Sequence, residues 1–253
     1  TDQPFAVALF LAFRATMRAA PIFWAEYLPG SNMMFDITIV QMNRGYLLGE
    51  VGARLSSSKI RAQAASAAHH LKHNSLARAG EMLATASSLD GASGRRAASR
   101  AVPLGGDYSD NAVNWSLPAL ALRRDCMLLG ASEEIGSALW HGENPIEPEW
   151  MRVKSAWAAE GKAWKFWIDW YEAALEGRSL ELEMLTEIAT QDDAFWQGTD
   201  DAVNARIAAI YDRYLQSSGS DVSEASNWSK AQIVRTRRAI DENQAVLPPT
   251  LDA

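Results

Sequence analysis

The chain has 253 residues, of which 48% are hydrophobic and 22% are charged. This balance is that of an ordinary globular protein, and it excludes a wholly disordered chain and a collagen-like fibre. The single cysteine, Cys126, excludes an intramolecular disulfide and therefore a disulfide-stapled mini-protein. The sequence contains no nucleotide-binding loop, zinc knuckle or nucleophile elbow, so it indicates architecture better than activity.

The net charge of −7 is distributed unevenly along the chain. Residues 1–114 carry 11 Lys and Arg against 8 Asp and Glu, whereas residues 115–253 carry 13 against 23. The stretch Val51–Gly80 holds five cations and three histidines but no acid. Such a basic helix can contact phosphate or an acidic partner. We favour the simpler interpretation, in which the basic half docks on the protein's own acidic half.

An apolar run, Phe5–Phe13, lies near the beginning of the chain and is followed by two arginines. It is shorter than the roughly 20 residues that span a bilayer. Its cations follow the run, whereas those of a secretory signal peptide precede it. We therefore predict no transmembrane span, a cytoplasmic protein, and a buried N-terminal helix over Pro4–Ala19 that Pro21 ends. An interfacial membrane helix is the alternative.

Further helices are expected along the first half of the chain. Ser31 or Asn32, just after Pro29-Gly30, can cap a helix that continues to about Val51. The alanine-rich segment Ser57–Ser88 has no proline and predicts one more helix, because alanine has the highest helix propensity.

Glycine, serine and proline then accumulate over Ser88–Asn114, which indicates a loop or linker. This segment is also where the charge balance changes sign. We accordingly divide the chain into an alanine-rich N-terminal helical region (1–90), a basic Gly/Ser-rich loop or linker (91–114), a Trp-rich helical domain (115–216), and a linker with a tethered C-terminal helix (217–253).

Seven of the ten tryptophans lie between residues 140 and 196. Four aromatic residues in this stretch recur every seven positions: Trp150, Trp157, Trp164 and Tyr171. This spacing places them on one face of a helix over Glu149–Glu176. Since each aromatic side chain buries about 150–250 Å², we predict that this helix is the centre of the C-terminal core. The alternative is an exposed stacking platform, for which Trp170 or Phe166 would supply the ring.

The run WKFWIDWYEAALEG at 164–177 is followed by Ile188-Ala189, by FWQG at 195–198 and by VNARIAAI at 203–210. This pattern resembles the C-terminal region of a set of uncharacterised bacterial Trp-rich helical proteins. The resemblance covers roughly the second half of the chain. It implies a helical domain, and it implies no activity, cofactor or catalytic residue.

Two groups of residues suggest enzyme chemistry. His69 and His73 are four residues apart on the alanine-rich helix, the spacing at which two imidazoles can bind one metal ion. The position after His69 is a histidine, where a zinc peptidase has glutamate, and no third ligand is evident nearby.

Cys126 with His141 suggests a thiol nucleophile, but its apolar helical surroundings favour a buried, unreactive thiol. Most carboxylates fall in first turns of helices, where capping explains them.

Basic residues supply the candidate partner-binding surfaces. They lie in the loop (Arg95, Arg96 and Arg100) and on the last helix, Asn227–Val246 (Arg235, Arg237 and Arg238). The sequence therefore predicts an all-α multi-helix bundle with a Trp-rich C-terminal core, acting as a non-enzymatic interaction or adaptor protein that binds a protein partner without a cofactor. The alternatives are a metal-dependent hydrolase using His69 and His73, and nucleic-acid association through the basic half. The alanine-rich helix is also compatible with self-association of the protein.

Overall fold

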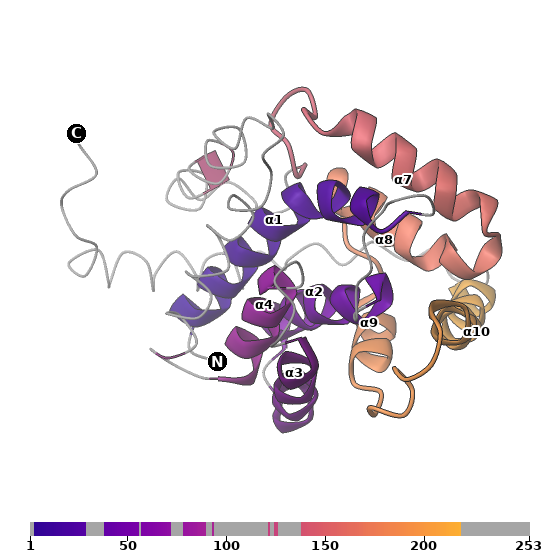
Figure 1. Cartoon of the computed structure of the whole chain (residues 1–253). Helices are drawn as coiled ribbons and strands as arrows, with labels where there is room; N and C mark the ends of the chain where they lie inside the picture. Colours follow the sequence, from indigo (N-terminus) through magenta and orange to yellow (C-terminus); the bar gives the residue numbers. More distant parts are fainter. Residues whose placement is uncertain are drawn as a thin grey trace.

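The computed structural model describes residues 3–28, 38–55, 57–71, 78–89, 93, 121, 124–125 and 138–218, and throughout these residues all regular structure is helical. The elements are α1 (Gln3–Glu26), α2 (Ile39–Arg54), α3 (Ser58–Leu71), α4 (Arg78–Ser88), α7 (Glu147–Ala159), η2 (Lys162–Trp164), α8 (Lys165–Leu175), α9 (Leu182–Ala189) and α10 (Asp200–Ser218). Helices α1 and α2 cross the centre of the molecule, with α3 and α4 to one side and α7 to α10 to the other (Figure 1). The predicted all-α multi-helix fold is confirmed.

Helix α1 continues through Pro21 to Glu26, so the predicted end before this proline was wrong. A proline inside a helix costs about 3 kcal/mol, because it removes one hydrogen bond and crowds the preceding turn. Beyond the proline, however, three large side chains are buried: Ile22, Phe23 and Trp24. Full burial of such side chains contributes about 1.5–3 kcal/mol each, which outweighs the cost of the proline.

The same helix is long and apolar enough to cross a membrane, judged by length and composition alone. The segment concerned is Ala6–Glu26, with a mean hydropathy of 1.4, and it is the one such helix in the described part of the chain. In this structure 72% of that apolar window is buried inside the protein. A core helix of a globular protein and a signal sequence pass the same test.

Helix α2 begins at Ile39, later than the sequence indicated; the expected caps, Ser31 and Asn32, lie outside the described residues. Its N-cap is Thr38, whose Oγ1 accepts a hydrogen bond from the Gln41 backbone N–H at 3.3 Å. The Gln41 side-chain oxygen accepts in return from the Thr38 backbone N–H at 3.2 Å. This reciprocal capping box satisfies two N–H groups that a helix N-terminus leaves without partners.

The alanine-rich segment forms two helices, α3 and α4, which pack against each other and against α2, instead of the single helix predicted. Two short helices bury more of their small side chains than one long helix could, and the buried ones are Ala64, Ala67, Ala84 and Ala86. Packing is close where α2 meets α4 and α1. A Cβ atom on Gly52 would lie 3.0 Å from the Ser87 Oγ and 3.2 Å from the Leu9 Cδ2.

The tryptophan-rich segment is a hairpin and not one helix. Helix α7 ends at Ala159, Gly161 reverses the chain with φ of 95°, and η2 leads into α8. Trp150 therefore packs on Tyr171, with ring centroids 4.4 Å apart, and Trp157 stacks on Trp164 at 4.9 Å. The four aromatic residues do meet in one cluster, but they come from two facing helices and the turn between them.

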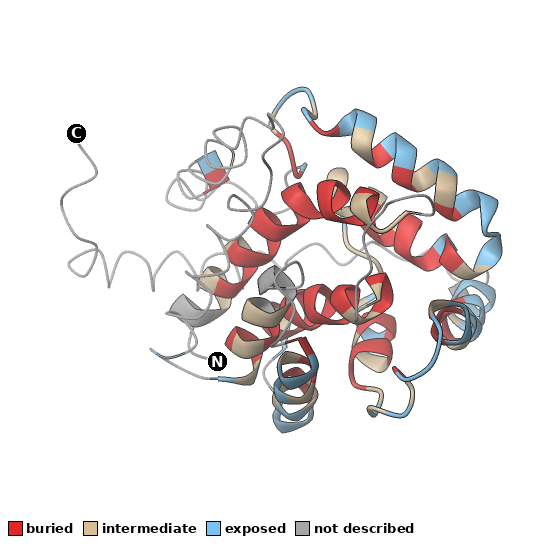
Figure 2. Cartoon of the chain, in the orientation of Figure 1, coloured by how far each residue is buried: buried red, intermediate tan, exposed pale blue. Residues whose placement is uncertain are grey.

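The core contains this aromatic cluster and extends into the N-terminal half. From α1, Trp24 joins it, with its ring centroid 5.0 Å from Trp157 and 5.1 Å from Tyr171. Phe166 and Trp170 are also buried, so neither forms the exposed stacking platform that was the alternative to core packing. Figure 2 shows α1, α2 and α8 buried over most of their surface, whereas α3, α7 and α10 each expose one side.

One hydrophobic cluster includes side chains from before and after the segment 91–114. Of the basic linker itself, only Ser93 is described. The division of the chain into regions therefore stays a prediction.

We expect Gly161→Ala to lower the free energy of unfolding by about 1–3 kcal/mol, because φ of 95° with ψ of −160° is a conformation that only glycine adopts readily. A Cβ at this position would meet nothing within 4 Å, so the loss would come from the backbone alone. The measurement is the free energy of unfolding of wild type and variant, obtained from urea titration. The matched control is Gly142→Ala, where a Cβ also meets nothing within 4 Å and no positive φ is required. Equal losses in the two variants would contradict the prediction.

Candidate functional site

A buried ion cluster connects α1 to residues far along the chain. Arg14 Nε and Arg18 Nη2 donate to the Asp125 carboxylate at 2.9 and 2.6 Å, and His141 Nε2 lies 2.8 Å from the same group. Both arginines and Asp125 are no more than 5% exposed. Burial by itself would raise the pKa of Asp125, but hydrogen bonds and charges from the two arginines outweigh it and hold the pKa below its usual range.

This cluster is arranged for structure more than for catalysis. An Asp–His pair can orient a general base, but here two arginines hold the oxygens of Asp125 as well. The arginines also bind backbone carbonyls, Arg14 that of Ala138 at 2.9 Å and Arg18 that of Leu139 at 2.8 Å. Cys126, the predicted thiol, lies outside the described residues. These hydrogen bonds and ion pairs therefore hold residues 138–141 against α1.

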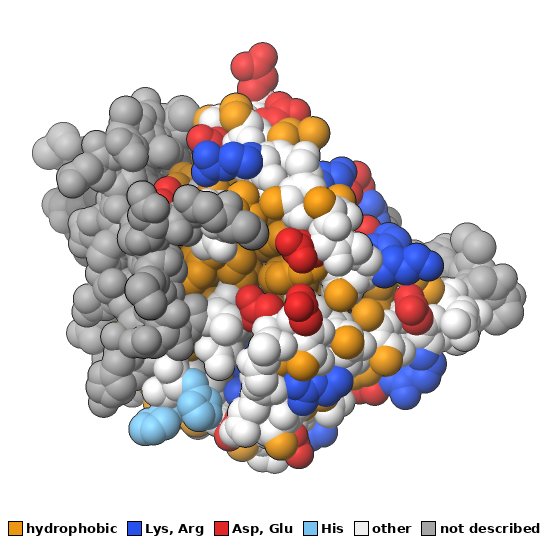
Figure 3. Space-filling model, turned by 45° about the vertical axis from the view of Figure 1, so that its right-hand side comes forward, with side chains coloured by type: hydrophobic (Ala, Val, Ile, Leu, Met, Phe, Trp, Pro, Cys, Tyr) orange, Lys and Arg blue, Asp and Glu red, His pale blue; other side chains and the backbone are white. Residues whose placement is uncertain are grey.

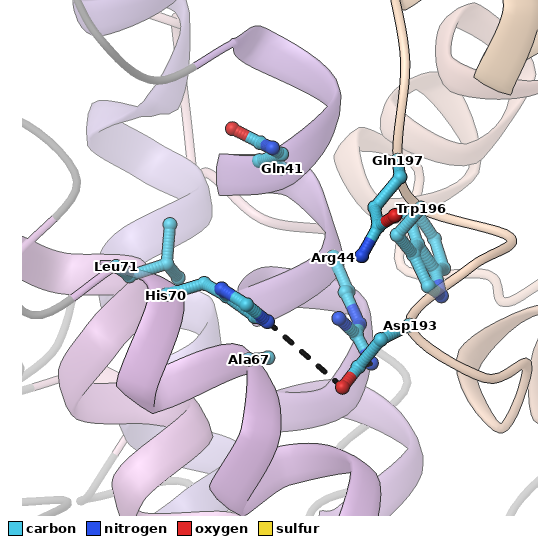
Figure 4. A pocket seen from close by; sticks show the side chains of 8 residues that line it. All are labelled: Gln41, Arg44, Ala67, His70, Leu71, Asp193, Trp196 and Gln197. Carbon is cyan, nitrogen blue, oxygen red and sulfur yellow. Dashed lines mark hydrogen bonds and ion pairs between the residues drawn. The ribbon is translucent and has the colours of Figure 1, made fainter.

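A small pocket lies where α2 and α3 meet the turn that follows α9 (Figure 4). Its volume is about 60 Å³, and it is lined by Gln41, Arg44, Ala67, His70, Leu71, Asp193, Trp196 and Gln197. The centre of the wall is Arg44, which is 3% exposed and has its guanidinium carbon 5.3 Å from the centroid of the Trp196 ring. Burial lowers the pKa of Arg44, while its bond to Asp193 acts in the opposite direction.

The pocket wall is held together by hydrogen bonds between residues that are distant in the sequence; Arg44 and Asp193 are 149 positions apart. Arg44 Nη2 donates to Asp193 Oδ1 at 2.9 Å and to Gln63 Oε1 at 2.8 Å. The Ser66 hydroxyl lies 2.6 Å from each Asp193 oxygen. The hydrogen bond from Ser66, followed by that from Arg44, keeps the pKa of Asp193 below its usual range. The carboxylate is therefore charged at neutral pH and pairs with Arg44.

Two buried donors in this wall have no hydrogen-bond partner among the described residues. They are the Nε of Arg44 and the indole Nε1 of Trp196. A buried N–H without an acceptor costs about 1–3 kcal/mol. Both N–H groups are buried behind the surface of the pocket, so they are not donors that the pocket offers to a ligand.

An open groove of about 490 Å³ lies between α9 and α10, beside the end of α2. It is lined by Leu55, Leu182, Glu183, Thr186, Glu187, Thr190 and Tyr214. The Tyr214 hydroxyl donates to Glu187 Oε2 at 3.0 Å, and Arg213 pairs with the same carboxylate. Burial, this hydrogen bond and the charges of Glu187 and Glu183 raise the pKa of Tyr214 to about 12. The groove thus combines an apolar floor with an acidic edge.

Of the two predicted metal ligands, the structure describes only one. His69 is exposed on α3, and its predicted companion, His73, lies outside the described residues. Within the described part of the chain, no group of three or more His, Cys, Asp or Glu side chains is placed to hold a metal ion. On the face drawn in Figure 3, histidine side chains project from one edge, while basic and acidic side chains are interspersed.

The six predicted partner-binding arginines also lie outside the described residues: Arg95, Arg96, Arg100, Arg235, Arg237 and Arg238. Sequence reasoning missed the residues that do form sites. It attributed most carboxylates to helix capping, whereas the side chain of Asp193 binds Arg44 and Ser66. The available signal was Arg44 itself, a charged residue between the apolar pairs Ile39-Val40 and Leu47-Leu48, because such a residue is seldom buried without a partner.

Comparison of the chain with protein-family models, with curated proteins and with solved structures gives no match. Function is therefore inferred from the residues of the pocket and the groove.

Proposed function

We propose that this protein is a non-enzymatic interaction protein that binds an amphipathic, basic helix of a protein partner in the α9–α10 groove. The observation that carries the proposal is the two-sided character of α9. Its inner face, formed by Met184, Leu185 and Ile188, is buried in the core. Its opposite face supplies most of the groove wall, at a spacing of four residues: Leu182, Thr186 and Thr190.

The groove has the chemistry of a helix-binding site. Leu55 and Leu182 give apolar contacts, and Leu55 is 37% exposed although it is a large hydrophobic side chain. A partner helix can place its apolar stripe against such a floor. The carboxylate of Glu183 borders the groove and favours Lys or Arg beside that stripe, whereas Glu187 is already paired with Arg213. Charge complementarity therefore selects a basic amphipathic helix.

The test is affinity purification of the tagged full chain from its source cells, with wild type compared with Glu183→Arg. Reversing an exposed charge beside the groove should weaken capture of the partner about tenfold or more, which corresponds to about 1.4 kcal/mol. The matched control is Glu147→Arg, which changes another exposed glutamate in the first turn of a helix, on α7.

A partner retained by the control and lost by Glu183→Arg supports the proposal. It must also contain a basic amphipathic segment that binds the purified protein as a synthetic peptide. Equal capture by all three forms, or no stoichiometric partner, would overturn it. If the wild type binds only when its own segment 227–253 is deleted, that segment occupies the groove, and no protein partner does so in the full chain.

A further inference from the structure

We propose that the chain's own C-terminal segment, 227–246, docks in the α9–α10 groove of the free protein and competes there with the partner. This inference rests on the proposed function, because it concerns the same groove and adds the regulation of that site. The segment itself lies outside the described residues. Three observations support it as the occupant: where the described chain ends, the charge of the segment, and the spacing of its apolar side chains.

The described chain ends beside the groove. Helix α10 ends at Ser218, one turn beyond Tyr214, which lines the groove. Residues 219–226 connect Ser218 to Asn227, where the segment begins. Eight extended residues reach up to about 26–29 Å. Helix α9, which forms most of the groove wall, has 8 residues and is therefore about 12 Å long. The segment can accordingly reach every part of the groove.

The charge of the segment complements that of the groove. Residues 230–240 carry four cations and no acid, and these cations are Lys230, Arg235, Arg237 and Arg238. The carboxylate of Glu183 is exposed at the edge of the groove. The lining also contains Glu187, which pairs with Arg213 of α10. Glu183 is therefore the carboxylate that attracts a cation of the segment.

The apolar side chains of the segment match the groove in length. Ile233 and Ile240 are seven residues apart, so they lie on one face of the predicted helix and about 10.5 Å apart along its axis. The wall of the groove runs along α9 from Leu182 to Thr190, a distance of about 12 Å. Two isoleucines therefore fit along this wall, and Arg237, between them in sequence, can reach the acidic edge.

The covalent connection strengthens even a weak contact. A short linker gives the attached segment an effective concentration on the order of 1 mM. A segment that binds the groove with a dissociation constant on the order of 0.1 mM would then occupy it about ten times as often as not. The apparent affinity for the partner falls about tenfold as a result, while the partner still binds the full chain. Docking of the segment thus regulates the proposed interaction without preventing it.

The experiment is disulfide trapping in the dilute full chain without a partner, with Cys126→Ser removing the single native cysteine. Thr186→Cys in the groove is combined with Thr236→Cys, which lies between the two isoleucines of the segment and leaves both in place. We expect this pair to form a disulfide, because docking brings the two positions within the roughly 4–7 Å between Cα atoms that the bond requires. The matched control combines Thr236→Cys with Ala209→Cys, at an exposed position of α10 outside the groove, and should react at least about tenfold more slowly.

A charge exchange identifies the contact with the acidic edge. Glu183→Arg and Arg237→Glu should each slow trapping about tenfold, whereas the two changes together should restore it, because opposite charges then face each other again. Glu147→Arg, on α7, is the control and should leave trapping unchanged. The inference is overturned if the groove pair reacts no faster than the control pair, or if the double charge variant traps no better than the single ones.

The outcomes separate this inference from the proposed function. If trapping fails while a partner is captured by the wild type and lost by Glu183→Arg, the groove binds a partner and the docking is overturned. If trapping succeeds and no partner is captured, the docking stands and the proposed function fails. A disulfide found only between two chains would mean that a second copy supplies the segment, which overturns docking within one chain. Where a partner is captured, Arg237→Glu should raise its capture by up to about tenfold, and unchanged capture would contradict the competition.

Discussion

We expect the Asp125→Asn variant to lose about 3–5 kcal/mol of unfolding free energy at pH 7, because it leaves two buried arginines without their carboxylate. Arg14 and Arg18 are 5% and 0% exposed, so water cannot replace the lost charge. Asparagine has nearly the shape of aspartate, and the variant therefore tests charge more than packing. The measurement is the midpoint of urea unfolding, with the slope of the transition compared between the two proteins.

The control for this variant is Glu176→Gln, which removes the charge from an ion pair with Arg178 that is 57–58% exposed. Exposed ion pairs contribute about 0–1 kcal/mol, so this variant should remain close to the wild type. A loss below about 1 kcal/mol in Asp125→Asn would show that the arginines are stabilised by other groups, and that the buried carboxylate is not the central element of the cluster.

The effect of Asp125→Asn should depend on pH with a defined sign. The arginines hold the pKa of Asp125 below its usual range in the folded state. The carboxylate therefore stabilises the fold fully above the unfolded-state pKa of about 3.9, and its contribution is lost as the pH falls through the lower folded-state pKa. The stability difference between wild type and variant should shrink below about pH 4.

The sequence contained enough information to predict helices but not where they turn. The seven-residue spacing of the tryptophans fits one helical face, yet the same residues are also placed symmetrically about the turn at Gly161. In a hairpin, Trp150 then faces Tyr171, and Trp157 faces Trp164. Periodicity alone does not separate these arrangements, because both are compatible with the same seven-residue spacing. Only the position of Gly161, inside the predicted helix, pointed to the break.

The sites were less predictable than the fold, because each joins segments that are distant in sequence. Asp193 meets Arg44 across 149 positions, and Asp125 meets Arg14 across 111. No local pattern encodes such pairs. What the sequence does show is a charged side chain interrupting an apolar helix, and buried charges of this kind require a partner. Attention to such residues would have found one half of each site, while the other half depends on how the helices pack.

We expect Trp24→Ala to lower the unfolding free energy by about 3–5 kcal/mol, which is the range for removing a large buried aromatic side chain. Trp24 is 0% exposed, and its ring centroid lies within 6.2 Å of those of Trp150, Trp157 and Tyr171. Removing it would leave a cavity where α1 meets the α7–α8 hairpin. Its indole N–H also donates to Asn43 Oδ1 at 2.8 Å, so the buried Asn43 would lose a partner.

Trp24→Phe separates these two contributions, because it keeps an aromatic ring and removes the indole donor. We expect this variant to lose about 1–3 kcal/mol, mainly from the unpaired oxygen of Asn43. Leu215→Ala, at a position that is 46% exposed, is the control and should change stability by no more than about 0.5 kcal/mol. If Trp24→Ala were no more harmful than Trp24→Phe, the loss would come from the hydrogen bond to Asn43 on α2, and the ring contacts would not be what connects α1 to the hairpin. A larger loss in the alanine variant places that connection in the aromatic cluster, and α1 then belongs to the same core as the C-terminal tryptophans.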